Sequence, residues 1–243
     1  MSQKPEVFTQ QFLFDEVETT MTVALNKVDE GITKGLVVMA NSQTQGRGRN
    51  GKSFQTPRDM GIWCTMGVEV EKNCSPHYYN KVFSVALSTL LEDSFGLEAK
   101  IKWPNDIYVG HKKICGILTE LHKNGKTLLL GFGLNLNQTK GIFGNELKDI
   151  ATSVYLETNK IINNRESLLE DILLAFEAAL DISEESISEH YKNKSMMWGR
   201  QAMFNQEVKF IIGVDEDGAL LIGDRIHPEK HLTGDLIPLE NVK

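Results

Sequence analysis

A polar, glycine-rich segment over residues 43–59 separates two short apolar stretches, 36–40 and 61–68. The apolar stretches have the length of buried strands, whereas the glycine and charged residues between them are typical of a loop. From residue 40 to residue 58 the chain carries four basic side chains and no acidic one, although its net charge is −7. The sequence therefore predicts a cationic loop that joins two strands.

This loop has the residue types of an anion-binding site. Gly46, Gly48 and Gly51 let backbone N–H groups approach a ligand closely, and successive N–H groups form a concave site for an anion. Arg47 and Arg49 offer planar groups that pair with a carboxylate or a phosphate. We therefore expect the loop to bind an anionic small molecule. A solvated surface loop of the same composition is the alternative.

Residues 46–53 also match the phosphate-binding pattern GxxxxGK[ST] letter for letter. That pattern requires a strand before it and a helix after it, because the phosphate binds at the helix N-terminus. Pro57 and Gly61 follow within eight residues of Ser53, and a strand then begins. The missing helix argues against a P-loop nucleotide hydrolase.

The remaining pattern indicates a larger α+β domain followed by a small β domain. Helices are predicted over 19–28, 79–95 and 167–180, and further strands over 100–103, 107–109, 114–121 and 127–137. Beyond residue 199 no helical pattern remains, and 208–214 with 219–223 resembles a hairpin. About 44 residues are too few for a comfortable core, so we expect 199–243 to lean on a domain formed by 1–198.

Composition disfavours several classes of protein. No apolar run approaches the roughly 18 residues that span a bilayer, and the N-terminus has no apolar signal core, so no membrane partner is expected. Cys64, Cys74 and Cys115 form no CxxC pair, which argues against a disulfide framework or a zinc site and favours a cytoplasmic location. A pI of about 5.4 argues against nucleic acid as a partner.

Two short segments place polar groups at strand ends. Lys102–Asp106 (KWPND) ends a strand with a proline turn, which aims Asn105 and Asp106 in fixed directions. An amide and a carboxylate there could read a base or ribose, hold a metal or orient an amine, although an Asx-rich turn is the alternative. Lys113 leads into an apolar strand and can face a pocket, whereas Lys112 fits a solvated hairpin tip.

Residues 131–137 (GFGLNLN) are predicted to lie in a buried strand. They are not a dinucleotide fingerprint, because Leu136 stands where the last glycine is needed and no helix follows. Glycines inside a strand suggest a close approach by ligand or backbone, and Asn135 needs a polar partner. His227 and His231 flank Pro228, and we interpret this segment as a surface turn rather than a metal site.

Taken together, these segments resemble the biotin protein ligase family. The resemblance is carried by GRGRNG (46–51), KWPND (102–106), KKICGILTE (112–120), GFGLNLN (131–137) and VDEDGALLIGD (214–224). It implies a catalytic domain like that of class II aminoacyl-tRNA synthetases, with a mixed or antiparallel sheet flanked by helices. It also implies an SH3-like β-barrel at the C-terminus. The implied activity is activation of biotin by ATP to biotinyl-5′-AMP, with Mg²⁺ accompanying ATP, then transfer to a lysine of a biotin carboxyl carrier protein.

The resemblance also implies a role for each matching residue. Thr19, Thr20, Met21 and Gln43 match the segment around the biotin ring, and Met21 stands where the family usually has asparagine. Arg47, Gly48 and Arg49 match the loop that closes over biotin and the acyl phosphate. Lys113 matches the lysine at the biotin carboxylate. Phe54 matches an aromatic residue that stacks on adenine. The adenylate contacts of the family match Lys102, Asn105, Gly116 and Asn135, and Gly116 also matches a contact with biotin. Asp106 would orient or deprotonate the acceptor lysine.

Other expectations depend on the same resemblance. Some family members carry an N-terminal winged helix; here the resemblance begins near residue 12, so no DNA-binding domain is expected. A homodimer is a possible assembly. The rivals are a lipoate or octanoate ligase, disfavoured by GRGRNG with KWPND, and a non-catalytic biotin sensor, disfavoured by Arg49, Lys113 and Asp106.

Overall fold

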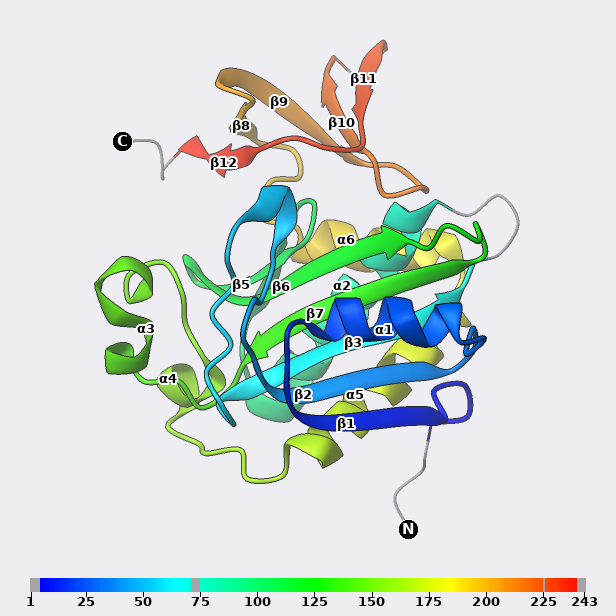
Figure 1. The fold of residues 1–243 in the computed structure, drawn as a ribbon. Helices are drawn as coiled ribbons and strands as arrows, with labels where there is room; N and C mark the ends of the chain where they lie inside the picture. Colours follow the sequence, from blue (N-terminus) through cyan, green and yellow to red (C-terminus); the bar gives the residue numbers. More distant parts are fainter. Residues whose placement is uncertain (1–4, 71–74, 225, 240–243) are drawn as a thin grey trace.

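The computed structural model describes residues 5–70, 75–224 and 226–239, and it contains two sheets (Figure 1). The larger sheet is mixed, in the order β1-β2-β3-β7-β6-β5-β4, and only β1 and β2 run parallel. Its strands are β1 (Gln10–Val17), β2 (Leu36–Gln43), β3 (Gly61–Glu69), β4 (Ala99–Lys102), β5 (Asp106–Val109), β6 (Lys112–Leu121) and β7 (Thr127–Asn135). The α+β class is confirmed.

Six helices accompany this sheet in the described part of the chain. They are α1 (Thr20–Asp29), α2 (Pro76–Phe95), α3 (Lys140–Leu147), α4 (Val154–Thr158), α5 (Arg165–Leu180) and α6 (Glu184–Lys194). The three predicted helices are confirmed as α1, α2 and α5. Thr19 caps α1, because its hydroxyl accepts from the Thr22 N–H at 2.9 Å.

The helices divide unequally between the two faces of the sheet. Helix α1 lies across one face, and α2 and α5 cover the other (Figure 1). Along β7 the side chains alternate, so Leu128, Leu130 and Leu134 enter the large core under α2 and α5. Leu129 belongs to a smaller cluster under α1. Most of the apolar core therefore lies on one face, and α1 leaves part of the other face free.

The smaller sheet is antiparallel, in the order β11-β10-β9-β8-β12. Its strands are β8 (Gln201–Phe204), β9 (Glu207–Val214), β10 (Leu220–Gly223), β11 (Pro228–His231) and β12 (Leu236–Pro238). The predicted hairpin is confirmed, with Leu220 paired to Val214. The surface turn predicted at 227–231 is wrong: Pro228–His231 forms edge strand β11, where proline needs no ladder N–H.

Two further observations concern membrane-spanning helices and the cysteines. No helix in the described ranges combines the length and the apolar content that crossing a membrane requires. Cys64 and Cys115 are buried free thiols, and burial raises the pKa of both. Cys74 lies outside the described residues. The division of the chain at 198/199 stays a prediction.

Candidate active site

A cavity of about 440 Å³ lies on the face of the sheet that α1 only partly covers. All the site residues predicted from the sequence line it. They are Thr19, Thr20, Met21, Gln43, Arg47, Gly48, Arg49, Phe54, Lys102, Asn105, Asp106, Lys113, Gly116 and Asn135. Residues from five separate segments thus meet at one site, although their individual roles stay predictions.

The cationic loop joins β2 to β3 and rises toward the smaller sheet (Figure 1). A short 3-10 turn, Arg49–Gly51, forms its tip, and Gly48 N–H donates to the Lys52 carbonyl at 2.7 Å. β3 follows the loop where a P-loop would need a helix. The letter match at 46–53 is therefore not a P-loop.

Arg165, at the start of α5, joins both ends of this loop. Its guanidinium donates to Asn41 Oδ1 at 2.8 Å on one side, and to Asp59 Oδ1 at 2.5 Å and the Gly61 carbonyl at 3.2 Å on the other. Arg58 forms a second ion pair, with Asp15. The base of the loop is therefore anchored, and its tip extends over the cavity.

The end of the cavity nearest α1 combines polar groups with an apolar floor. Gln43 Oε1 accepts from the backbone N–H and hydroxyl of Thr20, at 2.8 and 3.2 Å. The Thr20 hydroxyl also lies 2.9 Å from that of Thr65, which is fully buried on β3. A β-carbon on Gly131 would lie 3.0 Å from Met21 Cε. This end suits a compact ring with a few hydrogen-bonding groups.

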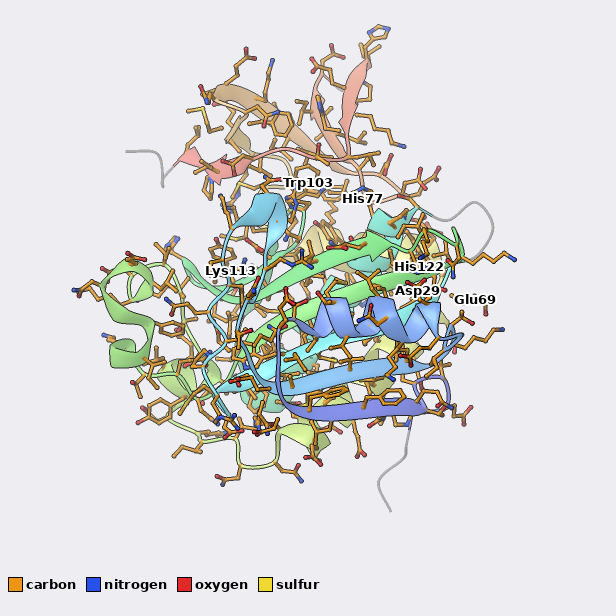
Figure 2. The ribbon with its side chains drawn as sticks, in the orientation of Figure 1. Asp29, Glu69, His77, Trp103, Lys113 and His122 are labelled. Carbon is orange, nitrogen blue, oxygen red and sulfur yellow. The ribbon has the colours of Figure 1, made fainter. Side chains whose placement is uncertain are left out.

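A lysine–carboxylate pair occupies the middle of the cavity. Lys113 Nζ lies 2.7 Å from Asp106 Oδ1, and their side chains are 28% and 20% exposed. The same ammonium lies 5.6 Å from the centre of the Phe54 ring, within cation–π range. Figure 2 shows Lys113 well away from Asp29 and His122, which pair at the far end of α1. The site thus holds a cation ready for an anionic group.

Glycines on two strands make room for Phe54. A β-carbon on Gly133 would lie 2.5 Å from Phe54 Cε1, and one on Gly116 would lie 3.1 Å from Cε2 and 2.8 Å from Lys113 Nζ. The closer approach is at Gly133, as the sequence suggested for the glycines of β7, whereas at Gly116 the flexible end of Lys113 could move aside. The edge of the Phe54 ring also meets Trp63, with ring centres 6.1 Å apart.

Amides and a lysine complete the wall opposite α1. Asn105 accepts from Arg49 Nη1 at 3.3 Å and donates to the Ile117 carbonyl at 2.6 Å, which fixes its side chain. Buried Asn135 has the polar partners that it needs, the Thr152 carbonyl at 3.0 Å and Gln138 Nε2 at 2.7 Å. Burial lowers the pKa of the Lys102 ammonium, and the carboxylates of Asp106 and Asp235 oppose that shift.

Sequence reasoning missed several residues of this cavity. Thr65 could have been found, because alternation along 61–68 places it on the same face as Trp63. Phe143 and Leu147 of α3, and Gly234, Asp235 and Leu236 of the smaller sheet, also line the cavity. Nothing in the local pattern points to these, since their positions depend on how distant segments pack.

The comparisons with known proteins assign this fold to a known class of enzymes. The model of the biotin/lipoate A/B protein ligase family matches residues 13–137, and the chain belongs to that family. The bifunctional ligase/repressor BirA of Bacillus subtilis is 28% identical over 236 residues, covering 90% of this chain and 71% of that protein. The biotin–[acetyl-CoA-carboxylase] ligase of Mycobacterium tuberculosis is 32% identical over 111 residues, 43% of this chain and 40% of that protein.

A solved structure agrees with the fold over most of the chain. The biotin protein ligase of Aquifex aeolicus, in complex with biotin and ATP, superposes with a TM-score of 0.81 at 25% identity. The match covers 94% of this chain and 98% of that chain. The similarity therefore extends beyond the family match into the smaller sheet.

Proposed function

We propose that this protein activates biotin with ATP to biotinyl-5′-AMP, and then transfers biotin to a lysine of a biotin carboxyl carrier protein. The observation that carries the proposal is the cavity itself. It combines a polar-and-apolar end for a ring, the Lys113–Asp106 pair, an anchored cationic loop and Phe54. A cytoplasmic location and a homodimer are further parts of this proposal.

In the first step, a biotin carboxylate oxygen would attack the α-phosphorus of ATP, and the bond to pyrophosphate would break. Lys113 would hold the carboxylate, and Arg49 would hold the phosphate whose negative charge grows. Asn105 would keep Arg49 in position through their hydrogen bond. Phe54 would stack on adenine, as the close approach of Gly116 and Gly133 allows.

In the second step, the acceptor amine would attack the acyl carbon, and AMP would leave with the former carboxylate oxygen. The amine must lose protons for this attack, and the Asp106 carboxylate would accept one or orient the amine. Lys113 would again stabilise the negative charge that develops on the acyl oxygen and the leaving phosphate. The transfer is favourable because biotinyl-5′-AMP is a mixed anhydride, with AMP as a good leaving group, and is therefore a much better acyl donor than a carboxylate.

Mg²⁺ would enter on the phosphates of ATP. The carboxylates that line the cavity are those of Asp106 and Asp235, and Asp106 is already paired with Lys113. We therefore assign Mg²⁺ no fixed ligand set on the protein. When bound, it would neutralise phosphate charge.

The test is ATP–pyrophosphate exchange measured separately with biotin, lipoate and octanoate. We expect exchange with biotin alone, and loss of that exchange in Lys113→Ala. Lys112→Ala is the matched control, because its ammonium contacts only the Lys148 carbonyl, at 3.3 Å, among the described residues. Exchange with lipoate or octanoate would contradict the assignment of biotin as the substrate. Tight biotin binding without exchange would indicate a non-catalytic biotin sensor.

A further inference from the structure

The turn between β9 and β10, residues 215–218, is held to the larger domain at three points. Lys81 Nζ, from α2, donates to the carbonyls of Asp215 at 3.1 Å and Glu216 at 2.8 Å. Trp103 Nε1 donates to the Gly218 carbonyl at 3.1 Å. Gly218 has φ +86°, and a β-carbon there would lie 2.5 Å from the His77 carbonyl. The turn thus fits closely against α2.

Lys81 is unusual among the lysines because its side chain is only 2% exposed. A buried ammonium is costly unless each of its protons has a partner. Besides the turn, its Nζ lies 2.9 Å from Glu184 Oε1 and 3.2 Å from Ser188 Oγ, both on α6, so its three protons are shared among four acceptors. One cation therefore joins α2, α6 and the smaller sheet.

Trp103 links the same turn to the active site. It belongs to KWPND, two residues before Asn105 and three before Asp106, yet its N–H binds the smaller sheet. Its ring lies 6.4 Å from that of Phe204 on β8. Figure 2 shows Trp103 and His77 close together where the two sheets meet. One side chain of the KWPND segment therefore binds the smaller sheet, and Asp106 lies three residues further along the same segment.

The turn is also joined to β11, the strand that leads into a segment lining the cavity. Lys230 on β11 pairs with Asp215 at 2.6 Å and Asp217 at 3.2 Å, and β11 leads directly into residues 232–236. Gly234 and Asp235 line both the main cavity and an adjoining hollow of about 620 Å³. Arg49, Asn105 and His77 line the same hollow.

We propose that Lys81, Trp103 and the turn 215–218 form an interdomain latch, which positions residues 233–236 at the reacting end of the cavity. The inference rests on the proposed function, because it assigns that end to the nucleotide and the acceptor. Lys81 and Trp103 are positioning residues. The ring end, at Thr20 and Gln43, lies on α1 and β2, and among the described residues no hydrogen bond joins these two side chains to Lys81, Trp103 or the turn 215–218.

The test compares Lys81→Met with Lys194→Met. Lys194 also joins α6 to α2, through Glu92 at 2.6 Å and with its side chain 12% exposed, but among the described residues its ammonium forms no ion pair or hydrogen bond with the smaller sheet. We expect Lys81→Met to raise KM for ATP about tenfold or more while the Kd for biotin changes less than about twofold, a loss confined to one substrate. Lys194→Met should change neither. A merely structural defect would lower the active fraction and leave both constants unmoved.

Trp103→Phe keeps the ring and removes the N–H, so it provides a second variant if Lys81→Met does not fold. It should raise KM for ATP in the same way. Unchanged KM for ATP in both variants, or a parallel loss of biotin affinity, would overturn the latch.

Hydrogen exchange of residues 215–224 and 226–236 gives a readout that needs no activity. Exchange there should be faster in Lys81→Met and Trp103→Phe than in Lys194→Met and the unaltered protein. If the unaltered protein shows no biotin-dependent exchange of pyrophosphate, the proposed function fails while this measurement still judges the latch. Equal protection in all four proteins would overturn it.

Discussion

Lys113 Nζ and Asp106 Oδ1 lie 2.7 Å apart, so the cation and the carboxylate proposed to act in the two chemical steps form an ion pair with each other. β5 and β6 bring them together, because Asp106 opens β5 and Lys113 lies near the start of β6. A biotin carboxylate that binds Lys113 would release Asp106. Asp106 would thus become available as a base only after the biotin carboxylate has bound to Lys113.

Asp106→Asn tests this division of labour. The amide keeps the shape of the side chain but cannot accept a proton from the acceptor amine. We expect biotin-dependent pyrophosphate exchange within about threefold of the unaltered enzyme, and transfer to the carrier slower by about 10²-fold or more. Single-turnover transfer from preformed adenylate is the measurement. Equal loss of both steps would show that Asp106 is not specific to transfer.

Gly133→Ala should displace the Phe54 ring. The added methyl would lie 2.5 Å from Phe54 Cε1, so the ring or β7 must shift. We expect KM for ATP to rise about tenfold, and stability to fall by about 1–3 kcal/mol from overpacking. Urea unfolding and exchange kinetics measure the two effects. Gly141→Ala is the control, because its nearest contact would be 3.8 Å away, and normal ATP binding in Gly133→Ala would contradict the assignment of Phe54 to adenine.

Arg165→Met should loosen the cationic loop at its base. The substitution removes the hydrogen bonds to Asn41, Asp59 and the Gly61 carbonyl at once. Because a closing loop retains a reactive intermediate, we expect biotinyl-adenylate to dissociate about tenfold faster. Proteolysis within residues 44–58 should accelerate in parallel. Lys34→Met, which breaks an exposed ion pair with Glu69, should change neither rate.

His77 should make stability depend on pH at the junction of the two sheets. Burial, and then the charge of Arg49, lower the pKa of its imidazole from 6.5, against the opposing charges of Asp215 and Asp217. The unfolded chain therefore binds a proton more readily than the folded one, and stability falls as the pH drops below 6.5 toward the folded pKa. His77→Gln should lose less stability than the unaltered protein between about pH 7.5 and about pH 5 in urea titrations. Identical losses would contradict the role of His77.

Local pattern was enough to predict the elements with strong apolar periodicity. α5 shows this clearly, since Leu168, Ile172 and Phe176 all lie on its buried stripe. α6 was not predicted, because Ile187 and Tyr191 are its only buried residues. β1 was missed for a similar reason: it is an edge strand with no fully buried side chain. α3 contains Gly144 at φ +67°, which interrupts any helical pattern.

The residues of the candidate site likewise divide into those that local motifs predict and those that depend on contacts between distant segments. Residues in recognisable motifs, such as Arg49 and Lys113, could be named from the sequence together with the resemblance. The partner of Trp103 could not, because its N–H binds a carbonyl 115 residues later in the chain. Asp235 was missed for the same reason. Contacts between distant segments leave no signal in local composition.

The alternation of β7 has a consequence for how such an enzyme can diverge. Its even-numbered residues, such as Leu130 and Leu134, belong to the main core, whereas Gly131, Gly133 and Asn135 line the cavity. Neighbouring positions on one strand therefore serve different purposes, one packing the core and the other lining the cavity. A library of variants confined to Gly131, Gly133 and Asn135 would explore new acids and nucleotides on an intact scaffold, and one confined to Leu128, Leu130 and Leu134 would vary the robustness of that scaffold.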